Sequence, residues 1–489
     1  MALVAVRLLL VAVLSAGAIV LVVGPAAADG SAVPQLRRDG RWMVDQFGRV
    51  VLVHGLNLVW KHKPYVPPPT AQGFTDKDAE WLYDHGFNGA RLGTLWTGVT
   101  PDRPGVEDPS YLDRWQPVVN ALAERRIWMQ FDFHQDMWHE KYGGEGAPDW
   151  ATHRPEPFAR SAIASAPFPM GYWMPELSTV YDNFWANKNG VLDQFARAWA
   201  ITANRYKDQP YSMGYDLMNE PWAGIEGMTC LIDGCPDTYR NELQPAFEKA
   251  LRAVRTVDPN NIVWFEPQQF AGGQRLDTFF TPVDGEQNLG FSWHNYCPDV
   301  FAESQGLPAG NMQGCRSFST DRNQHALDQG RRMNATTLMS EWGATDNTTA
   351  IGIDADVADR HLMGWMHWAY KKWGDPTTAD GDQGLFVDDS DLQSTKKDKL
   401  RRLVRTYPQA TAGIPKRLRF DTNTGDFTYT YEPGNADAPT EIFVSPLHYK
   451  HGPAITVDGG TVTNGLTDNR IQITASGNKP VTVTIKDHS

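Results

Sequence analysis

The segment Met213–Pro221 reads MGYDLMNEP, a short apolar run that closes on the polar residues Asn219 and Glu220. Longer amphipathic segments lie on both sides of it, at Leu192–Tyr206 and Tyr239–Val257. A short apolar run between two helical segments is typical of a strand in a parallel sheet. The pattern therefore predicts a buried strand with polar groups at its C-terminal end.

The same alternation extends along the chain and predicts eight strands with helices between them. A closed (β/α)₈ TIM barrel, an α/β fold, fits this pattern better than an open doubly wound sheet. The first strand is also not followed by the Gly-x-Gly-x-x-Gly turn of dinucleotide-binding sheets. The predicted strands are Val50–Asn57, Gly89–Gly93, Ile127–His134, Met213–Met218, Asn261–Glu266, Gly290–His294, Thr337–Ser340 and Gly364–Trp368. Further predicted helices are Thr75–His85, Tyr111–Arg126, Arg322–Met333 and Lys397–Tyr407.

The sequence predicts three parts. Residues 1–28 form a signal peptide, since the apolar run Leu8–Val23 follows Arg7 and precedes Ala26–Ala28; the alternative is an uncleaved membrane anchor. Residues 29–412 form the barrel, with an insertion at about 137–190 that serves as a lid or cleft wall. Residues 413–489 alternate polar and apolar residues between turns, which predicts an all-β sandwich. This sandwich is either a structural module packed on the barrel, which its few aromatic residues favour, or a carbohydrate-binding module.

The overall composition limits the classes of partner. The formal net charge of −13 argues against nucleic acid, because no basic stripe is present to neutralise phosphates. It also argues against simple electrostatic docking on anionic lipid. Eighteen Trp residues favour a sugar-binding cleft, in which flat rings stack on pyranose faces, although core packing accounts for many of them.

Four cysteines are present, and an exported chain permits disulfides. Their order favours Cys230–Cys235 and Cys297–Cys315 among three possible pairings. A zinc site is the rival interpretation, but it requires tighter pair spacing and histidine partners.

Polar residues close six of the predicted strands, and a barrel gathers such strand ends at one mouth. They are Arg91, Asp132, His134, Asn219, Glu220, His294, Tyr296, Glu341 and Trp368. Glu220 and Glu341 follow strands four and seven, which lie on opposite arcs of an eight-stranded ring. We therefore expect their carboxyl groups to face each other across the mouth, about 5 Å apart. Taken singly, each is better explained as a surface salt-bridge partner.

Two facing carboxyl groups suit the hydrolysis of a glycosidic bond with retention. In this interpretation Glu220 is the acid/base and Glu341 the nucleophile, with Arg91 and Tyr296 keeping Glu341 ionised. Asn219 donates to a sugar hydroxyl beside the anomeric carbon. His134 and His294 orient these groups or bind hydroxyls. No metal or cofactor is expected, because no His-x-x-x-His or Glu-x-x-His spacing accompanies the histidines.

The chain resembles glycoside hydrolase family five, whose catalytic glutamates close strands four and seven of a barrel. Asp216–Pro221 (DLMNEP) is similar to the acid/base motif of that family, and Ser340–Gly343 (SEWG) to its nucleophile motif. The positions of Arg91, His134, His294, Tyr296 and Trp368 match those of the family's supporting residues. The resemblance covers about Val50 to Tyr407.

Within the family the chain resembles the bacterial endoglycoceramidases. The similarity lies in His54–Asn57, in Phe131–Asp136, in the insertion after strand three and in the C-terminal sandwich. It implies a monomeric, secreted enzyme that acts on glycosphingolipids at a lipid or micelle surface and cleaves the β-glucosyl bond between glycan and ceramide. It also implies sugar contacts from Lys61, Asp132 and Trp173, and an apolar channel for the ceramide tails near Ala162–Met174.

Three alternatives remain open. A family-five cellulase or β-glucanase would stack several Trp rings along an open groove. A glucosylceramidase-like β-glucosidase would accept a single glucose. A non-catalytic glycolipid-binding or transfer protein would be expected to lack one of the two glutamates, and both are present.

Overall fold

The computed structural model describes residues 33–153, 168–227, 229–230, 234–269, 277–300, 312–377 and 383–488. The predicted signal peptide lies outside these residues, as does the first part of the apolar segment Ala162–Met174. Among the described residues, no helix combines the length and the hydropathy that a bilayer span requires.

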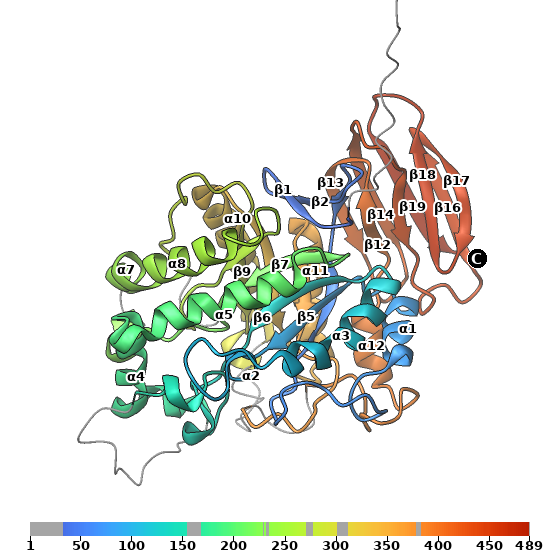
Figure 1. Ribbon diagram of the computed structural model, residues 1–489. Coiled ribbons are helices and arrows are strands. Elements are labelled where there is room, and N and C mark those ends of the chain that lie inside the picture. Colours follow the sequence, from blue (N-terminus) through green and yellow to red (C-terminus); the bar gives the residue numbers. More distant parts are fainter. Residues whose placement is uncertain are drawn as a thin grey trace, which may run out of the picture. The chain divides into compact units, whose positions relative to one another are not determined.

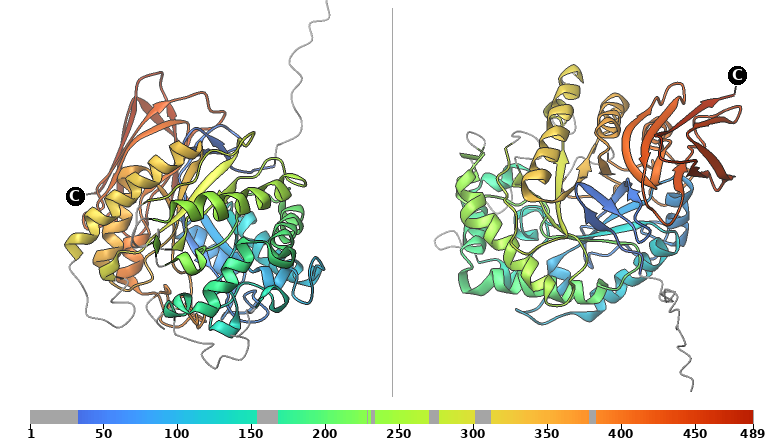
Figure 2. Two further views of the ribbon diagram at one scale, coloured as in Figure 1. Left: turned by 90° about the vertical axis from the view of Figure 1, so that its left-hand side faces the viewer. Right: turned by 90° about the horizontal axis from the view of Figure 1, so that it is seen from above.

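The predicted barrel is confirmed. Eight parallel strands close in the order β10-β11-β4-β5-β6-β7-β8-β9, and helices lie around them (Figures 1 and 2). The barrel strands are β4 (His54–Leu58), β5 (Gly89–Thr94), β6 (Trp128–Phe133), β7 (Ser212–Asp216), β8 (Val263–Phe265), β9 (Leu289–Asn295), β10 (Thr336–Trp342) and β11 (Gly364–His367). The positions of all but the first match the predicted strands closely.

The predicted strand Val50–Asn57 is divided in the structure. Only His54–Leu58 enters the barrel, as β4, while Val50–Val51 is β3 and pairs antiparallel with β2 (Trp42–Val44) and β12 (Tyr407–Thr411). Both halves are buried. Because the apolar run Val50–Val53 leads directly into His54–Leu58, the sequence pattern gives no sign of the break between the two strands.

The helices of the barrel largely follow the predicted segments, with two differences. The helix predicted to begin at Arg322 starts at Met312, and the last predicted helix ends at Leu403, so that Tyr407 belongs to β12. The helices are α1 (Asp76–Asp84), α2 (Trp96–Val99), α3 (Pro109–Glu124), α4 (Pro175–Trp185), α5 (Val191–Tyr206), α7 (Pro236–Thr238), α8 (Gln244–Arg255), α10 (Met312–Met333), α11 (Thr348–His361) and α12 (Lys397–Leu403). Short 3₁₀ turns are Glu140–Tyr142, Asp149–Ala151, Met170–Trp173, Lys188–Gly190 and Gly224–Glu226, and a π-helical turn covers Tyr239–Leu243.

The C-terminal region forms two antiparallel sheets. One has the order β13-β14-β19-β16, and the other the order β1-β2-β3-β12-β15-β18-β17. Their strands are β1 (Arg37–Asp39), β2, β3, β12, β13 (Gly413–Phe420), β14 (Phe427–Pro433), β15 (Thr440–Phe443), β16 (Pro453–Asp458), β17 (Gly460–Thr467), β18 (Arg470–Ala475) and β19 (Val481–Asp487). The larger sheet thus draws strands from both sides of the predicted boundary at residue 413.

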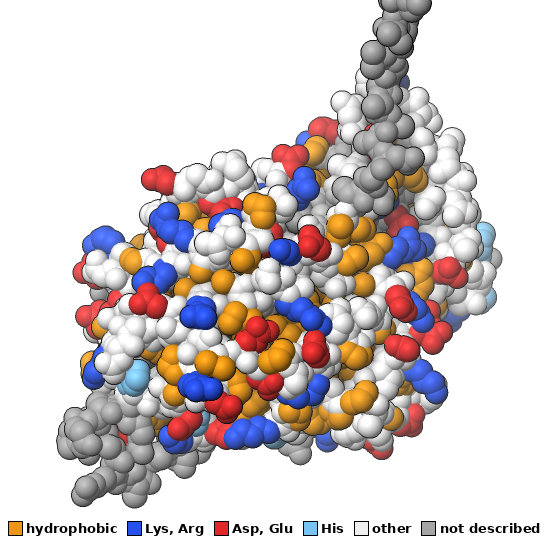
Figure 3. All heavy atoms as spheres, viewed as in Figure 1, with side chains coloured by type: hydrophobic (Ala, Val, Ile, Leu, Met, Phe, Trp, Pro, Cys, Tyr) orange, Lys and Arg blue, Asp and Glu red, His pale blue; other side chains and the backbone are white. Residues whose placement is uncertain are grey.

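The two sheets are tied to the barrel by buried contacts. The His54 ring, on barrel strand β4, stacks on Tyr407 of β12 with ring centroids 3.7 Å apart. Arg405, in the segment before β12, is 1% exposed and pairs with Asp359 and Asp356 of α11, each at 2.8 Å. On the face drawn in Figure 3, acidic and basic side chains are interspersed.

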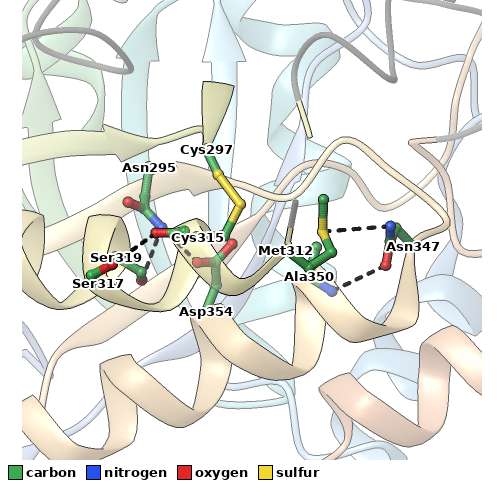
Figure 4. The surroundings of a disulfide bond; sticks show 10 residues. Asn295, Cys297, Met312, Cys315, Ser317, Ser319, Asn347, Ala350 and Asp354 are labelled. Carbon is green, nitrogen blue, oxygen red and sulfur yellow. Dashed lines mark hydrogen bonds between the residues drawn. A yellow bond between two sulfur atoms is a disulfide. The ribbon is translucent and has the colours of Figure 1, made fainter. Parts of the chain in front are cut away.

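Both predicted disulfides are present, with Cα atoms 4.4 Å apart for Cys230–Cys235 and 5.5 Å apart for Cys297–Cys315. The second joins the segment after β9 to α10, beside a buried polar cluster (Figure 4). At the end of β9, the Asn295 side-chain amide donates to Ser319 Oγ on α10 (3.2 Å) and to Asp354 Oδ1 on α11 (3.0 Å). The end of β9 is therefore held to both flanking helices.

Asp354 makes the stability of this region depend on pH. Burial raises the pKa of the Asp354 carboxyl to about 7, although hydrogen bonds from Ser319 and Asn295 oppose the shift. A carboxyl with a raised pKa in the folded state stabilises the fold at low pH, and this contribution is lost as pH rises from about 4 to about 7.

We therefore expect the free energy of unfolding of Asp354→Asn to change less between about pH 4 and about pH 7 than that of the wild-type protein. The difference between the two changes should be roughly 1.4 kcal/mol for each unit by which the folded and unfolded pKa values of Asp354 differ. Urea unfolding at several pH values measures this. Asp321→Asn, on the exposed surface of α10, removes the same charge and serves as the control. Parallel pH profiles for Asp354→Asn and the wild type would contradict the prediction.

Candidate active site

The predicted site residues come together at the C-terminal ends of the barrel strands. Arg91 lies on β5, His294 on β9 and Glu341 on β10, while Glu220 follows β7. The β10 register shifts between Met339 and Glu341, which is a local irregularity that changes the direction of the strand end. Glu220 has a φ of 41°, in the left-handed region that non-glycine residues rarely adopt. Such backbone strain clusters at functional sites.

Glu220 and Glu341 face each other. A carboxylate oxygen of each, together with a ring nitrogen of His294, lies within 4.8 Å of the other two atoms. The side chain of Glu220 is 13% exposed and that of Glu341 is 6% exposed. This spacing is that of two carboxyl groups which act directly on opposite sides of one bond, and it is too short for a water molecule held between them.

Two donors hold the Glu341 carboxylate. Arg91 Nη1 donates to Oε1 at 2.5 Å, and the Tyr296 hydroxyl donates to Oε2 at 2.9 Å, the two contacts that the sequence predicted. Burial nevertheless raises the pKa of Glu341, against the opposing charges of His294 and Arg91. The two donors thus counteract a desolvation cost that the sequence could not reveal.

His294 is surrounded by carboxyl groups. Its Nδ1 lies 2.8 Å from Glu220 Oε1 and 3.5 Å from Glu341 Oε2, and its Nε2 lies 3.2 Å from Glu266 Oε1. Burial alone would lower the pKa of His294, but the negative charges of Glu266 and Glu341 and the hydrogen bonds to Glu220 and Glu266 raise it well above its usual value. This shift favours the protonated ring, whose Nδ1–H donates to Glu220 while its positive charge also lies near Glu341.

Arg91 is the centre of the buried network. Its side chain is 0% exposed, and its Nη2 donates to the Asn219 amide oxygen at 3.0 Å and contacts Asp132 at 3.1 Å. Nε lies 3.2 Å from Asp216 and Nη2 lies 3.3 Å from Glu266. Burial alone would lower the pKa of Arg91, but these acidic neighbours raise it well above its usual value. One guanidinium thus fixes side chains from several neighbouring strands.

A second cluster lies beside the first, around Trp368. The His134 ring stacks on Trp368 with centroids 5.3 Å apart, and its Nδ1 lies 2.7 Å from Asp132 Oδ2. Burial alone would lower the pKa of His134, but the charge of Asp132 raises this pKa to about 10. Lys61 Nζ lies 4.7 Å from the Trp368 ring centroid and donates to Asp136 at 2.5 Å. The cluster therefore combines an aromatic ring with fixed charges in an enclosed position, since Trp368 is 4% exposed and Lys61 6%.

Comparison with known proteins assigns the family. Residues 44–375 match the family model described as cellulase (glycosyl hydrolase family 5), and residues 405–486 match the family 5 C-terminal domain. The chain belongs to glycoside hydrolase family 5. It is therefore a glycosidase, as the facing carboxyl groups predicted.

Relatives within family 5 extend over nearly the whole chain. Endoglycoceramidase I of Rhodococcus hoagii is 37% identical over 93% of this chain and 88% of its own. An endoglycoceramidase of Cyanea nozakii is 29% identical over 88% of both chains. The structure of endo-glycoceramidase II from a Rhodococcus species superposes with a TM-score of 0.74 at 25% identity, and the match covers 92% of this chain and 100% of that one.

The three predicted sugar contacts fall in different places. Lys61 lies beside Trp368, at the edge of the site. Asp132 is 0% exposed, with Oδ2 2.7 Å from His134 Nδ1 and Oδ1 3.1 Å from Arg91 Nη2. Trp173, in the turn Met170–Trp173, is 39% exposed, unlike the enclosed residues around the glutamates.

Sequence reasoning missed three residues of this family 5 site. Glu266 accepts the backbone N–H of Glu220 at 2.8 Å, and it follows β8 as Glu220 follows β7, so the strand-end rule could have found it. Gln135 donates to the carbonyl oxygens of Asn219 (2.8 Å) and Glu220 (3.0 Å). Asp136 pairs with Lys61. No periodicity marks the last two, because they lie in a loop.

Besides the disulfide-bonded Cys297 and Cys315 with Asp299, two groups of described side chains have the spacing of metal ligands. One is Glu220, His294 and Glu341, and the other is His134, Asp136 and Glu145. In the first group, the carboxylate oxygens already accept hydrogen bonds from Arg91, Tyr296 and Gln269. In the second group, the Lys61 ammonium already lies between the carboxylates, 2.5 Å from Asp136 and 3.8 Å from Glu145. Neither donor set suits a divalent ion.

We expect Tyr296→Phe to lower the kcat of glycoside hydrolysis about 10- to 100-fold with a smaller effect on KM. A hydrogen bond to a charged group contributes about 1.5–3 kcal/mol, and Glu341 would lose one of its two donors. Steady-state kinetics measures the effect. Tyr449→Phe, which removes a hydroxyl bonded to Thr406 among the C-terminal sheets, is the matched control. Equal kcat for both variants would show that the Tyr296 contact does not support the reaction.

Proposed function

We propose that this family 5 enzyme is an endoglycoceramidase, which hydrolyses the β-glucosyl bond between glycan and ceramide in glycosphingolipids and releases the intact oligosaccharide with retained configuration. The observation that carries the retaining mechanism is the approach of Glu220 and Glu341 to within 4.8 Å. The substrate class is supported by the relatives of that name, whose similarity extends over both the barrel and the C-terminal sheets.

In this proposal Glu341 is the nucleophile. Its oxygens are fixed by Arg91 and Tyr296, so attack on the anomeric carbon requires little rearrangement of the carboxylate. As the bond forms, the charge of Glu341 is neutralised, and a glycosyl-enzyme ester results. Burial, which raises the pKa of Glu341, disfavours its charged state and therefore favours this neutralisation.

Glu220 is the acid/base. It is the more exposed of the pair, and Gln269 Nε2 donates to its Oε2 at 3.1 Å while His294 holds Oε1. Glu220 gives a proton to the departing ceramide oxygen, then removes one from the water that hydrolyses the glycosyl-enzyme. His294 lies close to both glutamates, so it can stabilise negative charge on whichever carboxyl group is ionised at each step.

Asn219 is placed to hold the sugar. Its amide oxygen accepts from Arg91, and its Nδ2 donates to the Gln135 carbonyl at 3.0 Å. The second N–H of the amide is the group we assign to a hydroxyl beside the anomeric carbon. The Trp368 face and Lys61 are assigned to the sugar ring, and Trp173 to the outer part of the cleft.

The roles of the two glutamates can be separated with azide and an aryl β-glycoside, whose leaving group needs no acid. We expect Glu341→Ser to lose roughly 10⁴-fold or more in kcat/KM while still binding glycolipid, and Glu341→Ala with azide to form the α-glycosyl azide. Glu220→Ala with azide should form the β-glycosyl azide through the glycosyl-enzyme. Product configuration is read by NMR. Full turnover by Glu341→Ser, or the same azide anomer from both alanine variants, would exclude the mechanism.

The substrate class is tested by incubation with one ganglioside, with glucosylceramide and with soluble cellulose oligomers. We expect intact oligosaccharide and free ceramide from the ganglioside, and much slower cleavage of the other two. Chromatography of the glycan and lipid products distinguishes the outcomes. Cleavage of the cellulose oligomers to shorter oligomers, with no ceramide released, would identify a β-glucanase, and binding without products would identify a glycolipid-transfer protein.

The setting of the reaction follows from the same proposal. Removal of residues 1–28 on export would place the rest of the chain outside the cell, as the catalytic unit (residues 29–412) and the sandwich (residues 413–489). The disulfides Cys230–Cys235 and Cys297–Cys315 are stable in that oxidising environment. The enzyme would act there as a monomer on substrate held in a micelle or membrane surface.

A further inference from the structure

A polar cleft of about 680 Å³ lies outside the strand-end site. It is lined by α11, by the end of α12 and the segment after it, and by β13 with the turn that follows. None of the residues around Glu220 and Glu341 contributes to its lining. Its volume is in the range of small-molecule sites, which is roughly 300–1,000 Å³.

The cleft is basic in an acidic protein. Seven of the described residues that line it are Arg or Lys and three are Asp, whereas the whole chain carries a formal net charge of −13. Charges of one sign that converge on a concave surface concentrate the local field and attract ions of the opposite sign. The cleft is thus a local exception to the charge of the molecule.

The floor of the cleft is fixed by paired charges. Arg405 is buried, donates to Asp359 and Asp356, and also donates to the Phe420 carbonyl at 3.2 Å. Its charge is therefore already neutralised, and it serves as a rigid support. Lys416 is similarly paired, with Glu432 at 2.7 Å.

Other guanidinium groups keep their charge available. Arg402 Nη1 donates to Thr422 Oγ1 at 2.6 Å and to Asn423 Oδ1 at 3.1 Å, and both acceptors are neutral. The side chain is held in place without losing its charge. Arg417 and Arg419 are exposed and form no ion pair with any residue in the part of the chain that the structure describes.

The backbone of β13 brings these charges together. The register between β13 and β14 shifts between Pro415 and Arg417, and after this bulge Arg417 and Arg419 are both exposed while Leu418 and Phe420 are buried. The N-terminal amides of α11 are already capped by Asn347, so the arginine side chains supply the donors of the cleft.

We propose that this cleft binds a phosphate-bearing ligand through Arg402, Arg417 and Arg419. Guanidinium groups match phosphate oxygens with paired hydrogen bonds, and several converging arginines are a feature of phosphate sites. A rival explanation is that the arginines protect the exposed edge of β13 from pairing with another chain. That role would need only isolated charges, and it would not require neutral acceptors to orient Arg402. The phosphate belongs either to a free anion or to a lipid head group, and the two sources share this chemistry.

The test uses the whole protein and two probes. Inorganic pyrophosphate is titrated calorimetrically at about 0.15 M salt, where weak surface attraction is screened, and vesicles of phosphatidylcholine with and without phosphatidylglycerol are used in co-sedimentation. We expect saturable binding of one probe, weakened at least tenfold in Arg417→Gln/Arg419→Gln and in Arg402→Gln. Binding of pyrophosphate assigns a free anion, and binding of the acidic vesicles alone assigns a lipid head group.

The control variant is Lys450→Gln/Lys479→Gln, which removes two exposed charges from the C-terminal region outside the cleft. It should bind as the wild type does, and all variants should keep the wild-type melting temperature and glycosidase activity. Failure of the wild type to bind either probe, or equal weakening in the control, would overturn the proposal.

Discussion

The active site depends on one buried cation. Arg91 contacts five side chains from four barrel strands. They are Asp132 on β6, Asp216 on β7 and Asn219 after it, Glu266 after β8, and Glu341 on β10. Removing a guanidinium from water costs several kcal/mol unless anions surround it, and unpaired carboxylates at this depth would be equally unfavourable. These contacts therefore link the ends of several barrel strands through one side chain. The same condition that stabilises the mouth places the two glutamates opposite each other.

The network holds more carboxyl groups than cations, and protons provide the balance. Burial and the neighbouring acids raise the pKa of Asp216 well above its usual value, which favours its protonated form, although Arg91 opposes the shift. His294 instead gains a proton. A protonated His294 between Glu220 and Glu341 stabilises negative charge on either one. Such a group suits a double displacement, because negative charge leaves Glu341 when the glycosyl-enzyme forms and returns when it is hydrolysed.

Much of this could be predicted from the sequence, for identifiable reasons. A parallel strand buried on both faces is a short apolar run, so seven of eight barrel strands, and the polar groups at their ends, were found. Cys230–Cys235 and Cys297–Cys315 followed from sequence order. The sequence could not show that Val50–Val51 leaves the barrel, that Tyr407 lies in β12, or that Asp132 is enclosed. These features depend on which surfaces meet in three dimensions, and β3 pairs with β12, which lies more than 300 residues away.

This long-range pairing explains why the C-terminal sheets cannot be regarded as an appended module. The larger sheet contains β1 to β3, and β3 is joined by a short segment to β4, the first barrel strand. His54 on β4 stacks between Trp365 of β11 and Tyr407 of β12, so barrel and sheet share one packed layer. The neighbouring strand β11 leads directly to Trp368, which forms the aromatic face of the site. Loss of the C-terminal sheets would expose this layer and leave β3 without the strand β12. Through this layer, the sheets therefore support the strand that ends at Trp368.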